Sequence, residues 1–200
     1  EEALDPLVTA LAALSGLMQE SMIRQMGWRF MELGKRIERA QQTLSTVRSL
    51  VTPVLDDNDR SILQTALLLS MEVLITYRRR GRENRGLELG LELVLLDSSN
   101  PRSLIFQLER IEEHLAKLPR TDSSGELAEE DRALLEAITS LKLSRLSGLI
   151  QPDAGERVEM HKLLSNLDRL LKDFNGILSS KHFDLRTDPQ QLVTTFWGSR

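Results

Sequence analysis

The sequence predicts an all-α protein, a helical bundle of about seven helices, and three observations support this fold class. Helix-forming residues dominate, and the alternation of apolar and polar residues that is typical of strands is absent. Apolar residues instead recur at spacings of three and four, which place them on one face of a helix. Gly and Pro residues divide the chain into its segments. The 200 residues, 40% of them hydrophobic, are enough to bury one core.

Composition excludes several classes of protein. The formal charge of −4 is too small and of the wrong sign to indicate a nucleic-acid partner. The chain has no cysteine, so disulfides, thiolate metal sites and cysteine nucleophiles are excluded. No apolar run approaches the roughly 20 residues that span a bilayer. We therefore expect a cytoplasmic protein with no membrane and no nucleic-acid partner. Because the chain starts at Glu1 and its helical pattern follows at once, we expect it to be the C-terminal part of a larger protein.

The first two helices are predicted over residues 6–26 and 28–51, with Gly27 as a kink between them. Apolar residues of the second helix recur at alternating spacings of three and four, the seam of a bundle helix. This seam consists of Phe30, Leu33, Ile37, Ala40, Leu44, Val47 and Val51.

A charged flank lies beside this seam. It consists of Arg29, Glu32, Arg36 and Arg39 at helical spacing, and Glu38 points away from it. The simplest interpretation is a solvated flank with a Glu32–Arg36 pair that contributes a few tenths of a kcal/mol. Trp28 and Met31 argue against full exposure, because they lie opposite the seam and need cover.

A third helix is predicted over residues 60–80, after four polar residues, 56–59, that suit a helix N-terminus. It is apolar nearly all round, so we expect it to be central, with neighbours on several sides. Glu72 interrupts this apolar run, and a buried carboxylate without a partner is costly. We expect Glu72 to be paired with an arginine of the second helix, Arg36 or Arg39, or with one of the arginines at 78–80. Arg102 could join the same network. A ligand contact is the alternative.

The third helix ends in an arginine-rich stretch, residues 77–85, with five arginines and one glutamate. The stretch could bind an anion, or its charge could simply suit a helix C-terminus. A fourth helix is predicted over 86–96. Asn100 is expected to cap a fifth helix with Pro101 in its first turn. The buried stripe of this helix is predicted to be Leu104, Leu108, Ile111, Leu115 and Leu118.

The remaining chain is predicted to be a polar loop over 119–125 and two helices, 126–150 and one ending near residue 180, that form an antiparallel hairpin. We assign 1–183 to the domain and 184–200 to a C-terminal tail. Phosphate-binding loops, serine elbows and dinucleotide fingerprints are absent from the sequence. No histidine lies three residues after a glutamate, which is the spacing that di-iron helical bundles use. We therefore expect no metal and no cofactor in this chain. His114 is expected at the surface.

Three stretches resemble the Alpha-E superfamily, a bacterial helical domain named for a Glu-Arg motif. The first is 27–40, which contains Glu38-Arg39, the second is Thr-Tyr-Arg at 76–78, and the third is Asp-Ser-Ser-Asn-Pro-Arg-Ser at 97–103. A weaker match at 181–184 extends the resemblance almost to the C-terminus. Gly81 departs from it, because many members carry an aromatic residue there.

The resemblance implies an internally duplicated domain, of which this chain holds the second copy. It also implies partners: a circularly permuted ATP-grasp ligase, fused upstream or encoded nearby, and a transglutaminase-like protein. Such a context is typical of peptide synthesis or modification, and it assigns no catalysis to the helical domain. The oligomeric state, including a homodimer, stays open.

We therefore expect an accessory or substrate-presenting domain of an ATP-grasp-associated, amide-forming system. Two alternatives remain: an amide-transferring or amide-hydrolysing enzyme that uses its Glu/Arg cluster, and a basic module that binds an anionic ligand. An open polar cavity would favour a ligand or an enzyme, whereas a filled network would favour a scaffold. The candidate cluster comprises Arg36, Glu38, Arg39, Glu72, Tyr77, Arg78, Asp97, Asn100 and Arg102.

Overall fold

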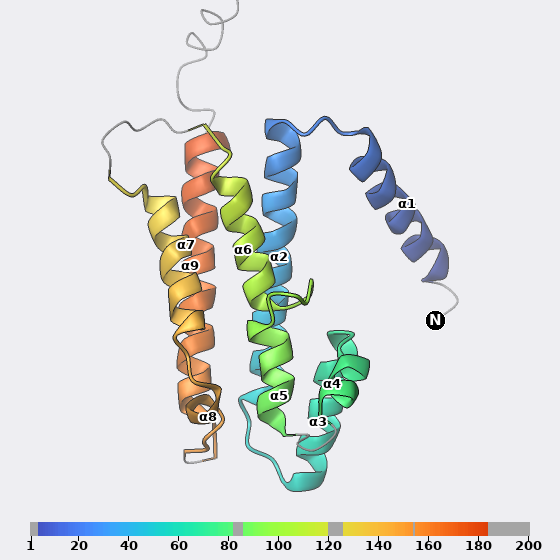
Figure 1. Cartoon of the computed structure of the whole chain (residues 1–200), viewed down its shortest axis with the longest axis vertical. Helices are drawn as coiled ribbons and strands as arrows, with labels where there is room; N and C mark the ends of the chain where they lie inside the picture. The colour runs from blue at the N-terminus through green and yellow to red at the C-terminus, as the bar shows by residue number, and fades with distance from the viewer. Residues whose placement is uncertain (1–3, 82–85, 120–125, 154, 184–200) are drawn as a thin grey trace, which may run out of the picture.

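Four long helices form the body of the molecule in this computed structural model, which describes residues 4–81, 86–119, 126–153 and 155–183. They are α2 (Met26–Val51), α6 (Leu104–Leu115), α7 (Glu129–Lys142) and α9 (Val158–Phe183). Each packs against two of the others, and together they form an upright bundle (Figure 1). The described parts of the chain contain no β-strand, which confirms the all-α prediction.

The core lies where the predicted apolar stripes of these helices meet. The seam of α2 is buried from Leu33 to Val51, and only Phe30 at its start is partly exposed. The stripe of α6 is buried as predicted, from Leu104 to Leu115. The predicted hairpin of α7 and α9 is also present, with the two helices packed along their length (Figure 1). Spacing alone therefore located the main core.

The predicted third helix is wrong in two respects. It is broken into α3 (Asp57–Ser70) and α4 (Leu74–Arg80), and Glu72, which lies in the break between them, has φ 54°. The N–H of Val73 donates to the carbonyl of Leu68 at 2.9 Å and that of Glu72 to Leu69 at 3.0 Å, which is the Schellman termination of a helix. The segment is also peripheral. Its apolar residues Ile62, Leu69 and Ile75 are more than half exposed.

The helix ends differ from prediction in places. Asp56 caps α3 as expected, accepting from the N–H of Asp59 at 2.9 Å. The cap of α6 is Ser103 rather than Asn100, because the Ser103 hydroxyl accepts from the N–H of Phe106. Asn100 instead closes the preceding turn, where its Oδ1 accepts from the N–H of Arg102 at 3.0 Å.

Short helices complete the lower part of the bundle. They are α5 (Leu87–Leu91), a π-helical turn at Glu92–Leu96 that continues it, and α8 (Leu146–Leu149). The predicted helix over 126–150 is therefore divided into α7 and α8. None of the described helices is both long and apolar enough to cross a membrane.

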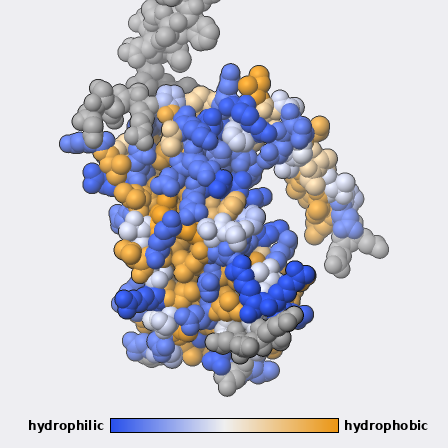
Figure 2. Space-filling view, viewed as in Figure 1, coloured by the Kyte–Doolittle hydropathy of each residue, from blue (hydrophilic) through white to orange (hydrophobic). Residues whose placement is uncertain are grey.

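The first helix, α1 (Asp5–Ser21), stands away from the bundle (Figure 1). It buries no residue, and its leucines are more than half exposed. Apolar side chains cover much of its visible face (Figure 2). The chain leaves the helix at Met22, so the break precedes Gly27, which lies inside the first turn of α2 and is not a kink between two helices.

Candidate functional site

A cavity of about 310 Å³ lies between α2, the end of α3 and the turn that precedes α6. Most of the side chains that line it are polar. From α2 come Arg39, Gln42, Thr43 and Thr46. From the end of α3 and from the turn and first part of α6 come Ser70, Met71, Pro101, Arg102 and Gln107.

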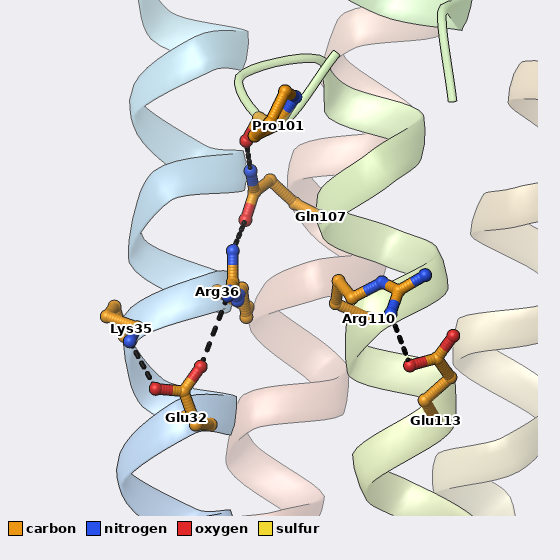
Figure 3. Close-up of polar contacts among 7 residues, drawn as sticks. All are labelled: Glu32, Lys35, Arg36, Pro101, Gln107, Arg110 and Glu113. Atoms are coloured by element: carbon orange, nitrogen blue, oxygen red, sulfur yellow. Dashed lines mark hydrogen bonds and ion pairs between the residues drawn. The ribbon is translucent and has the colours of Figure 1, made fainter. Parts of the chain in front are cut away.

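A chain of polar contacts fixes one wall of this cavity (Figure 3). Glu32, which is only 2% exposed, accepts from Lys35 and from Nη2 of Arg36, the latter at 3.2 Å. Nη1 of Arg36 donates to Oε1 of Gln107 at 3.3 Å, and Nε2 of Gln107 donates to the carbonyl of Pro101. These contacts connect α2 to the turn before α6, so the turn is held at a fixed place beside the cavity.

The charge of Glu32 is compatible with its burial. Burial is the largest single influence on its pKa and raises it, but the hydrogen bonds and positive charges of Lys35 and Arg36 together outweigh burial. The pKa of Glu32 is therefore lowered, and the carboxylate stays ionised at neutral pH. The predicted pair of Glu32 and Arg36 is confirmed. The flank is not uniformly solvated, because Glu32 is buried, Arg29 and Arg36 are partly buried, and only Arg39 is exposed.

His114 of α6 lies near the same flank. Its ring meets that of Trp28 edge-on, with centroids 5.1 Å apart, and the residue is 8% exposed. The prediction of a surface histidine is therefore wrong. Burial lowers the pKa of His114, so the neutral form is favoured. The cover that Trp28 needs comes from this histidine and from the guanidinium of Arg24, 4.4 Å from the Trp28 ring.

The cavity itself carries positive charge. Arg39 is exposed and makes no ion pair with any residue that the structure describes. Arg102, which is 50% exposed, pairs with Glu72 at 2.6 Å. None of the described residues that line the cavity is acidic. Two arginines therefore line a polar space, and the ion pair that the described contacts give to either of them is the one between Arg102 and Glu72.

Glu72 does not occupy the place that the sequence predicted. It is 65% exposed instead of buried, and of the arginines that were predicted to pair with it only Arg102 does so, at 2.6 Å. Glu72 is exposed because α3 ends before it. Its own backbone has the left-handed conformation, which directs its side chain away from the apolar core. Glu38 is exposed on α2 and is not among the lining residues of the cavity.

The other predicted residues hold loops in place. Tyr77 is buried, and its hydroxyl accepts from Nε2 of Gln64 at 2.7 Å. Asp97 accepts from Arg80 at 2.8 Å and from the N–H of Ser99. Burial raises the pKa of Asp97, but Ser99 and Arg80 lower it by more. Nδ2 of Asn100 donates to the carbonyl of Leu93 at 2.8 Å.

The arginine-rich stretch is only partly described. Arg78 is exposed and lines a separate shallow pocket beside Tyr77, away from the cavity that Arg39 and Arg102 line. Arg82 and Arg85 lie outside the described residues, as do residues 184–200, to which we assigned the tail. Whether this stretch binds an anion therefore stays an open alternative, and Arg39 and Arg102, the second from the Asn-Pro-Arg turn, line a different pocket.

Two cavity residues could have been found from spacing. Gln107 lies three residues after Leu104 and four before Ile111, so it shares the buried stripe of α6. Thr43 lies three residues after Ala40 and four before Val47, on the buried seam of α2. Polar residues on an otherwise apolar stripe need hydrogen-bond partners. Such residues therefore indicate a polar site at the edge of the core.

The chemical character of the cavity follows from the side chains that line it. Cationic and hydroxyl groups line the cavity, but the lining contains no histidine or carboxylate that could act as a general base, as far as the residues are described. Nor do the described residues include a cluster of His, Asp or Glu that could hold a metal ion. What the cavity offers is hydrogen-bond donors and positive charge.

Known proteins resemble the chain over most of its length. Uncharacterized proteins of Mycobacterium bovis and Mycobacterium tuberculosis are 34% identical to it over an alignment of 199 positions, which covers 96% of this chain and 21% of each relative. The chain thus spans about a fifth of the length of these relatives. No solved structure matches it. Residues 1–183 match a family described as a predicted α-helical domain with a conserved ER motif, and the chain therefore belongs to the Alpha-E family.

Proposed function

We propose that this Alpha-E domain is an accessory domain that holds a polar substrate in the cavity beside Arg39 and Arg102 and presents it to a partner enzyme. The observation that carries the proposal is the cavity, which is polar and lies at the surface between α2, α3 and the turn before α6. An open polar space can hold the polar groups of a ligand, whereas a network of side chains that filled it would leave no room for one.

The alternative of an enzyme in its own right has less support. It required Glu38, Glu72 and the arginines to line one pocket. Glu38 is exposed outside the cavity, and Glu72 is engaged with Arg102 at its edge. General acid–base catalysis needs a group within hydrogen-bond reach of the reacting atom. A binding role needs only the donors and charges that are present.

The partner that we propose is an amide ligase of the ATP-grasp type, with a transglutaminase-like protein as a further member of the system. This part of the proposal rests on the resemblance of the chain to the Alpha-E superfamily. Such a ligase uses ATP to convert a carboxylate into an acyl-phosphate, which an amine attacks with release of phosphate. A separate domain that positions one reactant would raise the effective concentration of that reactant at the ligase.

The test is a reconstituted reaction of the ligase with and without the chain, with ADP release and amide product as readouts. We expect the chain to lower the KM of the ligase for its substrate and to hydrolyse no ATP alone. Thr46→Leu, which narrows the cavity, should remove the effect. Ser49→Leu, on an exposed position of the same helix, is the matched control. Amide formation or hydrolysis by the chain alone would show that the domain is an enzyme.

A further inference from the structure

We infer that the cavity binds the anionic group of its ligand, a carboxylate or a phosphate, between Arg39 and Arg102, and that Glu72 pairs with Arg102 until the anion displaces it. The inference rests on the proposed function and adds the chemical class of the ligand and the residue that competes with it. Its basis is the charge of the lining residues together with the backbone conformation at Glu72.

The two arginines provide the recognition. A guanidinium presents donors in a planar fork that matches the oxygens of a carboxylate or phosphate. Arg39 makes no ion pair in the described part of the chain, so its donors are available to a ligand. Arg102 lines the same cavity from the turn before α6. An anion between them would be contacted from α2 on one side and from the Pro101 turn on the other.

The turn that carries Arg102 is held in place independently of its side chain. The N–H of Arg102 donates to Asn100, the N–H of Ser103 donates to the carbonyl of Asn100 at 3.0 Å, and Gln107 donates to the carbonyl of Pro101. The guanidinium can therefore exchange one partner for another without a change in the backbone.

Glu72 is an unusual residue for its position. Glycine is the usual residue after a helix that ends in a Schellman motif, because the left-handed conformation is unfavourable for a side chain with a Cβ. Glu72 adopts φ 54° there and places its carboxylate 2.6 Å from Nη2 of Arg102. The local hydrogen bonds do not require a glutamate. A carboxylate that neutralises Arg102 in the absence of ligand gives this residue a role.

The Glu72–Arg102 pair is weak enough to be displaced. Both side chains are at least half exposed, and an exposed ion pair changes an equilibrium by about fivefold at most. A ligand that reaches both arginines gains a second cation that Glu72 does not contact. The cavity of about 310 Å³ lies at the lower end of the range for small-molecule sites, so it suits a compact group such as the end of a short peptide.

The experiment is a titration of the ¹⁵N-labelled chain, followed by amide chemical shifts at constant ionic strength. The probes are inorganic phosphate and N-acetyl-alanyl-alanine, and the same dipeptide with an amidated C-terminus is the uncharged control. We expect saturable shifts at Thr43, Ser70 and Arg102 with at least one anion and none with the amidated dipeptide. The anion that saturates identifies the source of the negative charge, carboxylate or phosphate.

Three variants test the roles of the residues. Arg102→Gln should weaken binding by about tenfold or more, as expected for loss of a charged hydrogen bond. Glu72→Asn should strengthen binding by up to about fivefold, because the competing charge is removed and asparagine tolerates the left-handed conformation. Arg79→Gln, an exposed arginine of α4, should leave binding unchanged. Circular dichroism confirms that each variant is folded, and Arg39→Gln replaces Arg102→Gln if the latter is not.

Absence of saturation with both anions, or equal shifts with the amidated dipeptide, would overturn the anion site. Unchanged affinity in the Glu72→Asn variant would overturn the competition. Either failure is distinguishable from failure of the proposed function: stimulation of the ligase without anion binding removes only the ligand class, and anion binding without stimulation removes only the accessory role.

Discussion

Helices α1 and α2 carry the same apolar spacing but have opposite environments. In α2, Leu33, Ile37, Ala40 and Leu44 follow spacings of four, three and four, and all are at most 5% exposed. In α1, Leu7, Leu11, Leu14 and Met18 follow the same spacings, and the helix buries no residue. Periodicity therefore identifies the apolar face of a helix, but it does not identify what covers that face.

The two helices also differ in what flanks the seam. The flank of α2 is charged, and part of it packs against α6, where Glu32 of α2 and His114 of α6 are buried. The charged residues of α1 are only Asp5 and Glu20. Most of the stability of a helix in a protein comes from packing of its apolar face. Substitutions in α2 should therefore affect folding far more than equivalent substitutions in α1.

The largest difference is expected for the seams themselves. Leu44→Ala in α2 should reduce the free energy of unfolding by about 2–5 kcal/mol, because it leaves a cavity at a side chain that is 1% exposed. Leu11→Ala in α1, where the side chain is 56% exposed, should change it by about 0.5 kcal/mol or less. Urea denaturation measures both. Equal losses for the two variants would mean that α1 packs against a surface in solution.

The next effect concerns the charged flank of α2. Glu32→Ala should reduce the free energy of unfolding by about 1–3 kcal/mol, because it leaves Arg36, 16% exposed, without its carboxylate partner. Glu38→Ala is the matched control, since Glu38 lies exposed on the same helix. A loss as small as that of the control would show that the flank is solvated after all. The same urea titration applies.

Acidification should destabilise the contact between α2 and α6 through two titratable groups, Glu32 and His114. The pKa of Glu32 is lowered, so its contribution is present above the ordinary value of 4.5 and is lost as pH falls through its folded pKa. The pKa of His114 is lowered by burial, so unfolding is favoured as pH falls below its ordinary value of 6.5. Stability should therefore decrease from neutral pH towards pH 4.

His114→Gln isolates the histidine contribution. Since glutamine does not titrate, this variant should show a flatter dependence of unfolding free energy on pH between about 7 and 5. His161→Gln, at an exposed histidine of α9, should keep the slope of the parent protein. An unchanged slope in His114→Gln would mean that His114 ionises in the folded state as it does in water.

The smallest effect is expected at Glu72, outside the covered flank. Glu72→Ala should cost less than about 1 kcal/mol, because the ion pair that it removes is exposed. Glu72→Gly should be more stable than Glu72→Ala by about 1 kcal/mol, since glycine adopts the left-handed conformation without a Cβ. If alanine reduced the free energy of unfolding by several kcal/mol, the result would support the original prediction that Glu72 is buried. Thermal and urea unfolding of the pair decide between these outcomes.

The sequence predicted the parts of the fold that follow from local periodicity. The seam of α2, the stripe of α6 and the α7–α9 hairpin all depend on apolar residues at helical spacing, and all are present. The cap at Asp56 was also predictable, because its side chain bonds within the first turn. These features require only neighbouring residues.

One of the missed features lacks its usual local signal, and the others depend on contacts between distant residues. The break at Glu72 lacks the glycine that normally marks a helix end, so the apolar run was read as continuous. The burial of His114 depends on its ring contact with Trp28, which lies 86 positions earlier in the sequence. Of the candidate cluster, Arg39 and Arg102 line one cavity, Glu72 pairs with Arg102, and Arg36 supports the wall through Gln107. Spacing within a helix cannot specify such pairs.

The most direct test of the account is a crystal structure of the chain grown with N-acetyl-alanyl-alanine, or with phosphate if phosphate saturates in solution. The account predicts density for the anion between Arg39 and Arg102, with the carboxylate of Glu72 moved away from Arg102 and the Pro101 turn unchanged. Anion density elsewhere, with the Glu72–Arg102 pair intact and side chains closing the cavity, would contradict it.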